Sequence, residues 1–171
     1  MPRYVAFLRG VSPLNAKMPA LKACFEQLGF TDVRTLLSSG NVVFTSSRKS
    51  VPALVQTIES GMASELPRSF PTVLRTVEHL RGMLQADPFS RFSLPHGAKC
   101  VVTFLSQPPQ ASIALPIELE GAQILAATDS EVFSAYIPGE RGPVFMNLIE
   151  KTFGKNVTTR TLETVRKCAS A

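Results

Sequence analysis

Apolar positions in the first 77 residues follow two patterns, short β-rich runs and longer segments with helical spacing. The short runs predict strands at residues 4–8, 33–37, 42–45 and 72–77. One longer segment repeats apolar residues at i, i+3, i+4 and i+7 between Pro19 and Gly29, and a second stripe runs from Pro52 to Pro67. Both predict amphipathic helices. The resulting order, βαββαβ, is that of a ferredoxin-like plait.

The second half of the chain is less regular, but it carries sheet and helix patterns of its own. The predicted elements are a short helix at 80–84, strands at 99–105, 122–126 and 132–137, a helix from Pro143 to Gly154 and a last helix at 161–168. A proline-rich loop spans residues 107–116. We therefore expect an α+β protein, in which a ferredoxin-like plait at 1–77 and a less regular α/β half at 78–171 form one compact unit.

The composition is that of a folded protein without export or membrane signals. Of the 171 residues, 44% are hydrophobic and 18% are charged, which excludes disorder as the main state. The apolar run at the N-terminus is too short for a signal-peptide core. The longest charge-free stretch, residues 100–117, contains three prolines, which a membrane helix does not accommodate. We expect a cytoplasmic protein with no membrane span.

The cysteines and histidines show no diagnostic spacing. Cys24, Cys100 and Cys168 are odd in number, lack a Cys-x-x-Cys pair and have apolar neighbours, so we interpret them as reduced structural residues. His79 and His96 form no metal-ligand spacing with each other or with a cysteine. The sequence predicts no metal and no cofactor.

Positive charge is concentrated in part of the chain. The net charge is +5, and residues 1–85 carry ten basic and five acidic side chains. Residues 86–171 carry eight of each, although the last 21 residues hold five basic side chains and one acidic one. An anionic ligand would therefore bind the N-terminal half or the C-terminal tail.

Two loops of the predicted plait are expected to meet at one rim. In this topology the third strand lies between the first two and runs antiparallel to the first, so the end of 4–8 adjoins the start of 42–45. The residues that would meet there are Arg9, Gly10, Lys17, Ser39, Gly40 and Asn41. Their cations, hydroxyls and backbone N–H groups suit an anion. For these residues taken alone a purely structural role is favoured over ligand binding, because hairpins need Gly40 and Asn41 and Arg9 can pair with a carboxylate.

A second candidate anion site lies at the predicted opening of the last helix. Thr158, Thr159 and Arg160 would supply hydroxyls, free backbone N–H groups and a guanidinium. The alternative is that a threonine caps the helix and Arg160 is solvated. The sequence favours neither, since a basic residue at a helix start opposes the macrodipole and invites an anion.

Two further features receive structural interpretations. Tyr4, Phe7 and Phe44 on adjacent strands raise the possibility of RNA bases stacking on the sheet, but the basic-glycine-aromatic pattern is missing. We expect Phe44 to pack against the two helices. The segment 136–139 could line a pocket, although a strand end with a turn explains it fully.

Several segments together resemble one family across nearly the whole chain. They are Arg3–Val11, Gly29–Val33, Ser39–Phe44, Thr158–Arg160 and Thr164–Lys167. On these segments the chain resembles the family called domain of unknown function 1697 (DUF1697). The resemblance implies an α+β fold with ferredoxin-like plait units and carries no established activity.

The sequence departs from the pattern of that family at two places. Where the loop after Gly10 often has a glycine pair, this chain has Pro13–Ala16, which disfavours a tight phosphate-binding loop. After Arg160, Thr161–Glu163 replaces the familiar Asn-Trp-Asn, which removes an indole and adds a negative charge.

These observations favour binding of a small anionic ligand, such as a nucleotide or a phosphorylated metabolite, at one rim that would combine Arg9, Lys17, Ser39 and Asn41 with Arg160. Two alternatives stay open. One is non-specific nucleic-acid binding through the basic N-terminal half and tail. The other is an enzyme of unrecognised type, because no Ser/His/Asp set, paired carboxylates or Gly-rich phosphate loop occurs at diagnostic spacing.

Overall fold

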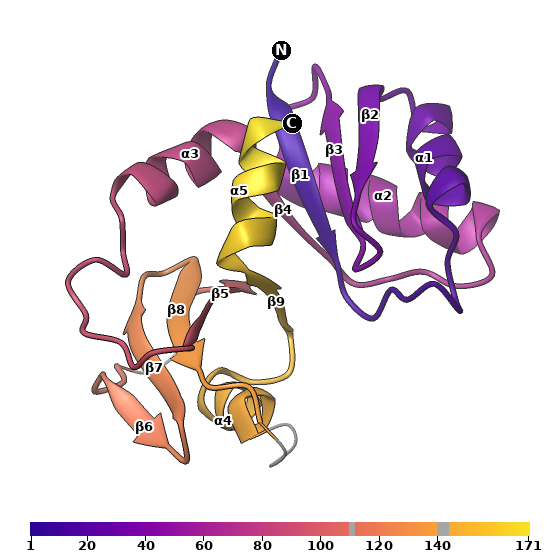
Figure 1. The fold of residues 1–171 in the computed structure, drawn as a ribbon. Helices are drawn as coiled ribbons and strands as arrows, with labels where there is room; N and C mark the ends of the chain where they lie inside the picture. The colour runs from indigo at the N-terminus through magenta and orange to yellow at the C-terminus, as the bar shows by residue number, and fades with distance from the viewer. Residues whose placement is uncertain (110–111, 140–143) are drawn as a thin grey trace. The chain divides into compact units, whose positions relative to one another are not determined.

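The fold is mixed α+β, as the sequence predicts. The structure, a computed structural model, describes residues 1–109, 112–139 and 144–171, and contains five helices and two antiparallel sheets within them (Figure 1). Contacts divide the chain into two compact units. The N-terminal unit comprises Met1–Met83 and Arg166–Ala171, and the central unit comprises Leu84–Val165. The divisions fall inside α3 (Val77–Gln85) and α5 (Leu162–Ser170).

The N-terminal unit has the predicted order of strands and helices. Its elements are β1 (Arg3–Leu8), α1 (Met18–Gln27), β2 (Thr31–Leu36), β3 (Asn41–Thr45), α2 (Val51–Glu65) and β4 (Thr72–Thr76). The strand order β2-β3-β1-β4 places the third strand between the first two, which confirms that prediction. The fourth strand ends at Thr76, one residue before its predicted end, because α3 begins at Val77 without a connecting loop.

Sequence signals at the helix ends explain where α1 and α2 begin and end. Pro19 stands in the first turn of α1, and Gly29 follows that helix with φ +92°, a conformation that favours glycine. At α2, the Ser50 hydroxyl accepts a hydrogen bond from the Ala53 backbone N–H at 3.4 Å and caps the helix. Pro52 stands in the first turn of α2, as predicted.

One face of this sheet carries an aromatic core against α1 and α2. Phe44 is fully buried between Phe25 of α1 (centroids 5.5 Å apart) and Phe30 (4.4 Å apart, stacked), which confirms that Phe44 packs against the helices. Tyr4 is 2% exposed on the same face, and Phe7 is fully buried on the other. The possibility of stacking RNA bases on these rings is therefore wrong, because none of the three is accessible.

The chain's last residues also belong to the N-terminal unit. Nε of Arg3, at the start of β1, donates to the backbone oxygen of Ala171 at 2.9 Å. Nε of Arg81 in α3 donates to the backbone oxygen of Ala169, also at 2.9 Å. A helix ends with unpaired carbonyls and partial negative charge, so two guanidinium groups stabilise the last turn of α5.

Among its described residues, the central unit contains a second sheet and one complete helix. Its elements are β5 (Lys99–Leu105), β6 (Ile117–Leu119), β7 (Ala122–Ala127), β8 (Glu131–Tyr136), α4 (Val144–Phe153) and β9 (Val157–Thr161). The strand order is β6-β7-β8-β5-β9. Neither β6 nor β9 was predicted. The predicted helix start at Pro143 and part of the predicted 107–116 loop lie outside the described residues.

The helix α4 covers one face of the second sheet. Its Phe145, Leu148 and Ile149 pack with residues from four strands, among them Val101 and Ile124. Gly154 ends the helix with φ +90°, and its N–H donates to the Glu150 carbonyl at 2.8 Å. No helix in the described parts of the chain has the length and apolar character needed to cross a membrane.

Alkaline pH is expected to destabilise the protein partly through Tyr4. Its buried hydroxyl donates to the Arg48 carbonyl at 2.9 Å, and burial raises the pKa of Tyr4 above the ordinary value. The tyrosine's contribution is therefore complete below the unfolded pKa and decreases as pH rises toward the folded pKa. In urea titrations, Tyr4→Phe should lose about 1 kcal/mol at pH 8 and depend less steeply on pH between about 9 and 11 than the unaltered protein. Equal pH slopes would contradict this assignment.

Candidate functional site

The structure brings together the two predicted rim loops within the N-terminal unit. Phe7 of β1 is paired with Asn41 of β3, and the Leu8 N–H donates to the Gly40 carbonyl at 2.8 Å. Gly40 has φ +88°, and a Cβ there would lie 2.8 Å from Val11 in the other loop. Only glycine fits this close approach. The predicted adjacency of the end of the first strand and the start of the third is confirmed.

Many polar groups of the rim already form hydrogen bonds with the backbone or side chains of its own loops. The amide of Asn41 is fully buried and donates to the Leu36 carbonyl and the Ser39 hydroxyl, both at 2.9 Å. In the other loop, the Asn15 amide donates to the Gly10 carbonyl at 2.9 Å. The Lys17 ammonium donates to the Pro13 carbonyl at 3.5 Å. These bonds organise the loops, which is the structural role that the sequence favours for the rim.

The second predicted anion site is not at a helix start. Thr158, Thr159 and Arg160 lie within β9 and pair with β5. The helix α5 begins at Leu162, and the Thr161 hydroxyl accepts from the Thr164 N–H at 3.2 Å as its cap. The earlier placement is wrong because the β-branched run favours a strand and the capping threonine comes later. The three residues belong to the central unit, whereas the rim belongs to the N-terminal unit.

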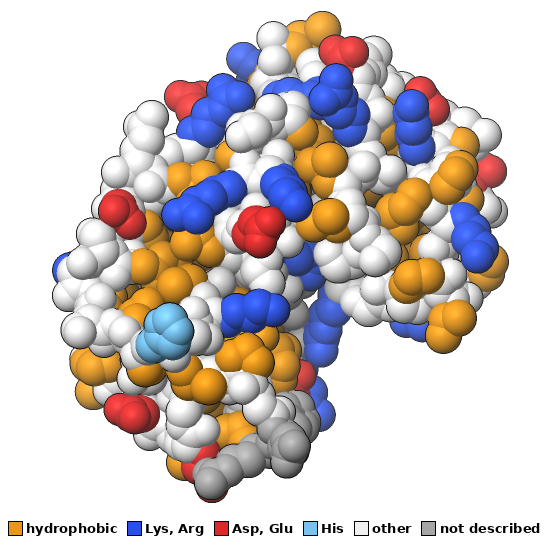
Figure 2. Space-filling model, viewed as in Figure 1, with side chains coloured by type: hydrophobic (Ala, Val, Ile, Leu, Met, Phe, Trp, Pro, Cys, Tyr) orange, Lys and Arg blue, Asp and Glu red, His pale blue; other side chains and the backbone are white. Residues whose placement is uncertain are grey.

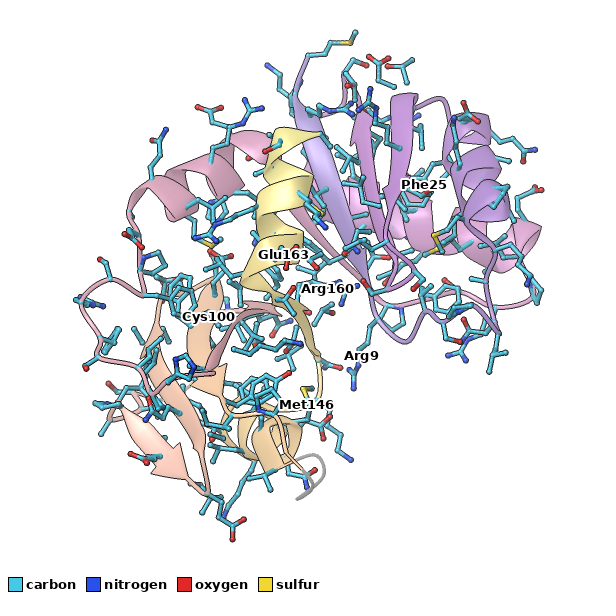
Figure 3. The ribbon with its side chains drawn as sticks, viewed as in Figure 1. Arg9, Phe25, Cys100, Met146, Arg160 and Glu163 are labelled. Carbon is cyan, nitrogen blue, oxygen red and sulfur yellow. The ribbon has the colours of Figure 1, made fainter. Side chains whose placement is uncertain are left out.

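A cavity of about 800 Å³ lies in the central unit. It is lined by three strand or turn segments and the first turn of α4, together with Val101 of β5. The lining residues are Val101, Glu120, Gly121, Ala122, Tyr136, Ile137, Pro138, Gly139, Val144, Phe145, Met146, Thr159, Arg160 and Thr161. Figure 3 labels Met146 and Arg160, which come from α4 and β9.

Strand pairing explains how the cavity floor forms. Val101 is paired with Thr161 on one side and Ser134 on the other, so these residues project from the same sheet face. Tyr136 follows two residues after Ser134 and shares that face. The Tyr136 and Phe145 rings stack at 5.1 Å with 15° between their planes, which gives the cavity a flat aromatic wall.

The hydroxyl groups on this face differ in their hydrogen bonding. The Thr103 and Thr159 hydroxyls bond to each other at 2.8 Å, and the Thr161 hydroxyl bonds to that of Thr164 at 2.9 Å. The Ser134 hydroxyl is fully buried and has no partner among the described residues. A buried hydroxyl without a partner costs free energy, so this residue needs another explanation.

Arg160 contributes positive charge at the edge of the sheet. Side chains alternate along a strand, so the Arg160 side chain leaves β9 on the sheet face opposite to those of Thr159 and Thr161. Its guanidinium then folds back onto the strand, where Nη1 donates to the Thr159 carbonyl at 2.9 Å. Arg160 is among the residues that line the cavity, and only 9% of its surface is exposed.

Two parts of the cavity lining are candidate sites in the sequence analysis. The segment Tyr136–Gly139 can line a pocket, although a turn after a strand explains it fully, and all four of its residues line the cavity. Thr159 and Arg160, two of the three residues of the predicted second anion site, line it as well. The other lining residues come from distant segments, whose convergence depends on the missed strand β9 and on the position of α4.

The cysteines offer no exposed thiol cluster. Cys24 and Cys168 are buried, and Cys100 is half-buried. Burial, and then the nearby Glu65 carboxylate, raise the pKa of the Cys24 thiol. This thiol therefore stays protonated and is a poor nucleophile at neutral pH. Among the described residues, no group of three His, Cys, Asp or Glu side chains is placed to hold a metal ion.

Comparison with protein families identifies the relatives of the chain. The model for a protein of unknown function, DUF1697, matches residues 1–133. The chain belongs to the DUF1697 family. This confirms the resemblance seen in the sequence. The match includes the whole rim of the N-terminal unit but ends inside β8, so ten of the fourteen cavity-lining residues follow it.

A solved structure extends the comparison of the DUF1697 fold to the rest of the chain. The conserved bacterial protein SP0830 from Streptococcus pneumoniae is similar with a TM-score of 0.73 and 21% sequence identity. The likeness covers 99% of this chain and 97% of that chain. At this identity it shows the fold alone. The search among curated proteins gives no match.

The two rim glycines offer a test of the close loop contact. Gly10 also has a positive φ, +84°, but a Cβ there would meet nothing within 4 Å. Gly10→Ala should therefore cost about 1–2 kcal/mol from backbone conformation alone. Gly40→Ala should cost about 1–3 kcal/mol more, because Val11 must move. Equal losses in urea denaturation would show that the approach of Val11 is not restrictive.

Proposed function

We propose that the cavity of the central unit binds a small organic molecule that carries an anionic group, such as a nucleotide or a phosphorylated metabolite. The observation that carries the proposal is the cavity itself. Its volume of about 800 Å³ falls within the range of about 300–1,000 Å³ typical of small-molecule sites. Such sites combine an apolar lining with a few polar groups, and this lining has that composition.

The aromatic wall supports a ligand with a flat apolar part. Tyr136 and Phe145 are stacked with each other, and the surrounding lining includes Ala122, Val144 and Met146. Burying a planar ring against such side chains removes apolar surface from water, which is favourable in proportion to the area. A nucleobase is one group with this shape.

Two features support a place for the anionic group. The lining includes Val144, Phe145 and Met146, which form the first turn of α4. Backbone N–H groups in a first helical turn have no partner within the helix and attract anions. The Arg160 guanidinium donates to the carbonyl of the lining residue Thr159, so it supplies positive charge beside the cavity. The acidic Glu120 at the lining would instead suit a donor group, such as a hydroxyl or amine of the ligand.

The rim of the N-terminal unit remains a separate prediction for anion binding. Its cations are Arg9, which is half-buried, and Lys17, which is exposed. The internal bonds of Asn15 and Asn41 leave fewer free donors there than the sequence suggested. For this reason the cavity is the better-supported site.

A thermal-shift screen with a blocked cavity tests the proposal. The panel contains nucleotides, phosphorylated sugars and aromatic carboxylates at millimolar concentration. A ligand at about 100 times its Kd stabilises by about 2.7 kcal/mol, which corresponds to a shift of about 5–10 °C for a chain of this size. Ile137→Trp should abolish the shift, because Ile137 lines the cavity and is 42% exposed.

The matched control places the same bulk outside the cavity. Leu119 of β6 is 47% exposed and does not line it, so Leu119→Trp should keep the full shift. Arg160→Gln should weaken anionic ligands more than their uncharged analogues. The proposal is overturned if no compound in the panel shifts the melting temperature, or if the shift survives in Ile137→Trp.

Ser134 gives a test that needs no ligand. Because its buried hydroxyl has no partner, Ser134→Ala should leave the free energy of unfolding unchanged or raise it by up to about 1 kcal/mol. The comparison variant, Thr103→Val, breaks the bond to Thr159 and should lose about 1 kcal/mol. A loss of stability in Ser134→Ala would show that the hydroxyl has a structural partner.

A further inference from the structure

We propose that one face of the N-terminal unit binds the phosphate backbone of double-stranded nucleic acid through four arginines. These are Arg3, Arg34, Arg81 and Arg166, and we call them the arginine face. This inference is independent of the cavity, which lies in the other unit. It names the residues that would contact a nucleic acid and the form of nucleic acid that they would bind.

Charge is divided more sharply between the units than between the halves of the sequence. The N-terminal unit holds twelve Lys and Arg residues and five Asp and Glu residues, an excess of seven positive charges. The central unit holds six and eight. A net charge of this size on fewer than 90 residues attracts polyanions and repels other cations.

The sheet register places two of the arginines on one face. Arg34 of β2 is paired with Val43, and Val43 is paired with Val5 of β1. Paired residues share a sheet face, and Arg3 precedes Val5 by two residues, so Arg3 and Arg34 both project from it. This face is opposite to the aromatic core, because Tyr4 points the other way.

The last turn of α5 brings the other two arginines to this region. The backbone oxygens of Ala171 and Ala169 accept hydrogen bonds from Arg3 and Arg81. Arg166 is exposed one turn earlier in α5. Figure 2 shows Lys and Arg side chains gathered over the region where Figure 1 places α5, β1 and β2.

These guanidinium groups retain donors for phosphate. Within the described residues, Arg34 and Arg166 make no side-chain hydrogen bond or ion pair. Arg81 uses only Nε, and Arg3 uses Nε and Nη1 but not Nη2. None of the four is paired with an Asp or Glu side chain in the parts of the chain that are described. Guanidinium groups outside such ion pairs keep their attraction for anions.

Arginine is the side chain best suited to phosphate oxygens, because its planar fork donates two parallel hydrogen bonds. A lipid surface fits less well. Of the large exposed apolar side chains that the structure describes, only Met1 is within two residues of a member of the arginine face, and a membrane-binding face needs several.

The buried aromatic rings favour a duplex over a single strand. Proteins that bind single strands stack the bases on exposed aromatic side chains. Tyr4, Phe7 and Phe44 of this sheet are at most 2% exposed. The arginine face therefore contacts backbone only, and the duplex has the higher phosphate density. We expect binding without sequence preference.

Fluorescence anisotropy with a fluorescein-labelled 24-base-pair DNA duplex tests the proposal at 50–200 mM NaCl. Four phosphate contacts predict a slope of log K against log[NaCl] of roughly −3 to −4, a loss of about 100-fold across this range. The unpaired 24-nucleotide strand should bind no more tightly than the duplex. Arg34→Gln with Arg166→Gln should lower the steepness of the slope by about 2 and weaken binding at least tenfold at 50 mM NaCl.

The control is a double variant with the same change in net charge. Lys22 and Lys49 are exposed. Lys22 belongs to α1, which packs on the opposite face of the sheet, and Lys49 follows Arg48, whose carbonyl accepts from Tyr4 on that opposite face. Lys22→Gln with Lys49→Gln should therefore change the affinity less than threefold. Unchanged melting temperatures establish that both doubles are folded. The proposal is overturned by absence of duplex binding at 50 mM NaCl, by equal losses in the two doubles, or by a single strand that binds tenfold more tightly.

Discussion

Two guanidinium groups hold the end of the chain on the unit in which the chain began. Arg3 and Arg81 donate to the backbone oxygens of Ala171 and of Ala169 in the last turn of α5. Cations at a helix C-terminus are favourable because they meet unpaired carbonyls and the negative end of the dipole. Residues 84–165 are consequently an insertion between two parts of one unit.

The sequence predicted the elements whose patterns are local and complete. The strands of the N-terminal unit, both of its long helices and the position of β3 follow from periodicity, proline and glycine. The missed strands were short or lacked apolar alternation: β6 has three residues, and β9 reads Val-Thr-Thr-Arg-Thr. The β-branched residues of Thr158–Arg160 favour a strand, but a threonine also suits a helix start, and pairing with β5 decides between the two.

Prediction of the candidate sites is limited in the same way, because their residues come from segments that are far apart in the sequence. The rim could be predicted, since its two loops follow from one strand adjacency, and Gly40 and Asn41 stand where that adjacency requires them. The cavity could not, because its wall combines β5, β8, β9 and α4, which the sequence separates by up to 60 residues. In the sequence the arginine face appears only as an excess of positive charge. Which arginines form it depends on the contact between Arg3 and the end of the chain after α5.

In this chain the best guides to function are residues whose polar or charged groups lack a partner within the described fold. Most polar groups of the rim have partners, and a structural role accounts for them. Ser134 is buried without a partner, and Arg34 and Arg166 hold charges that no described carboxylate neutralises. A sequence under selection for stability alone would replace such groups at no cost. Arg3 and Arg81 are less informative, because their bonds to α5 make them structural as well. Functional tests are therefore sharpest at Arg34 and Arg166, where we expect loss of the side chain to leave the fold intact.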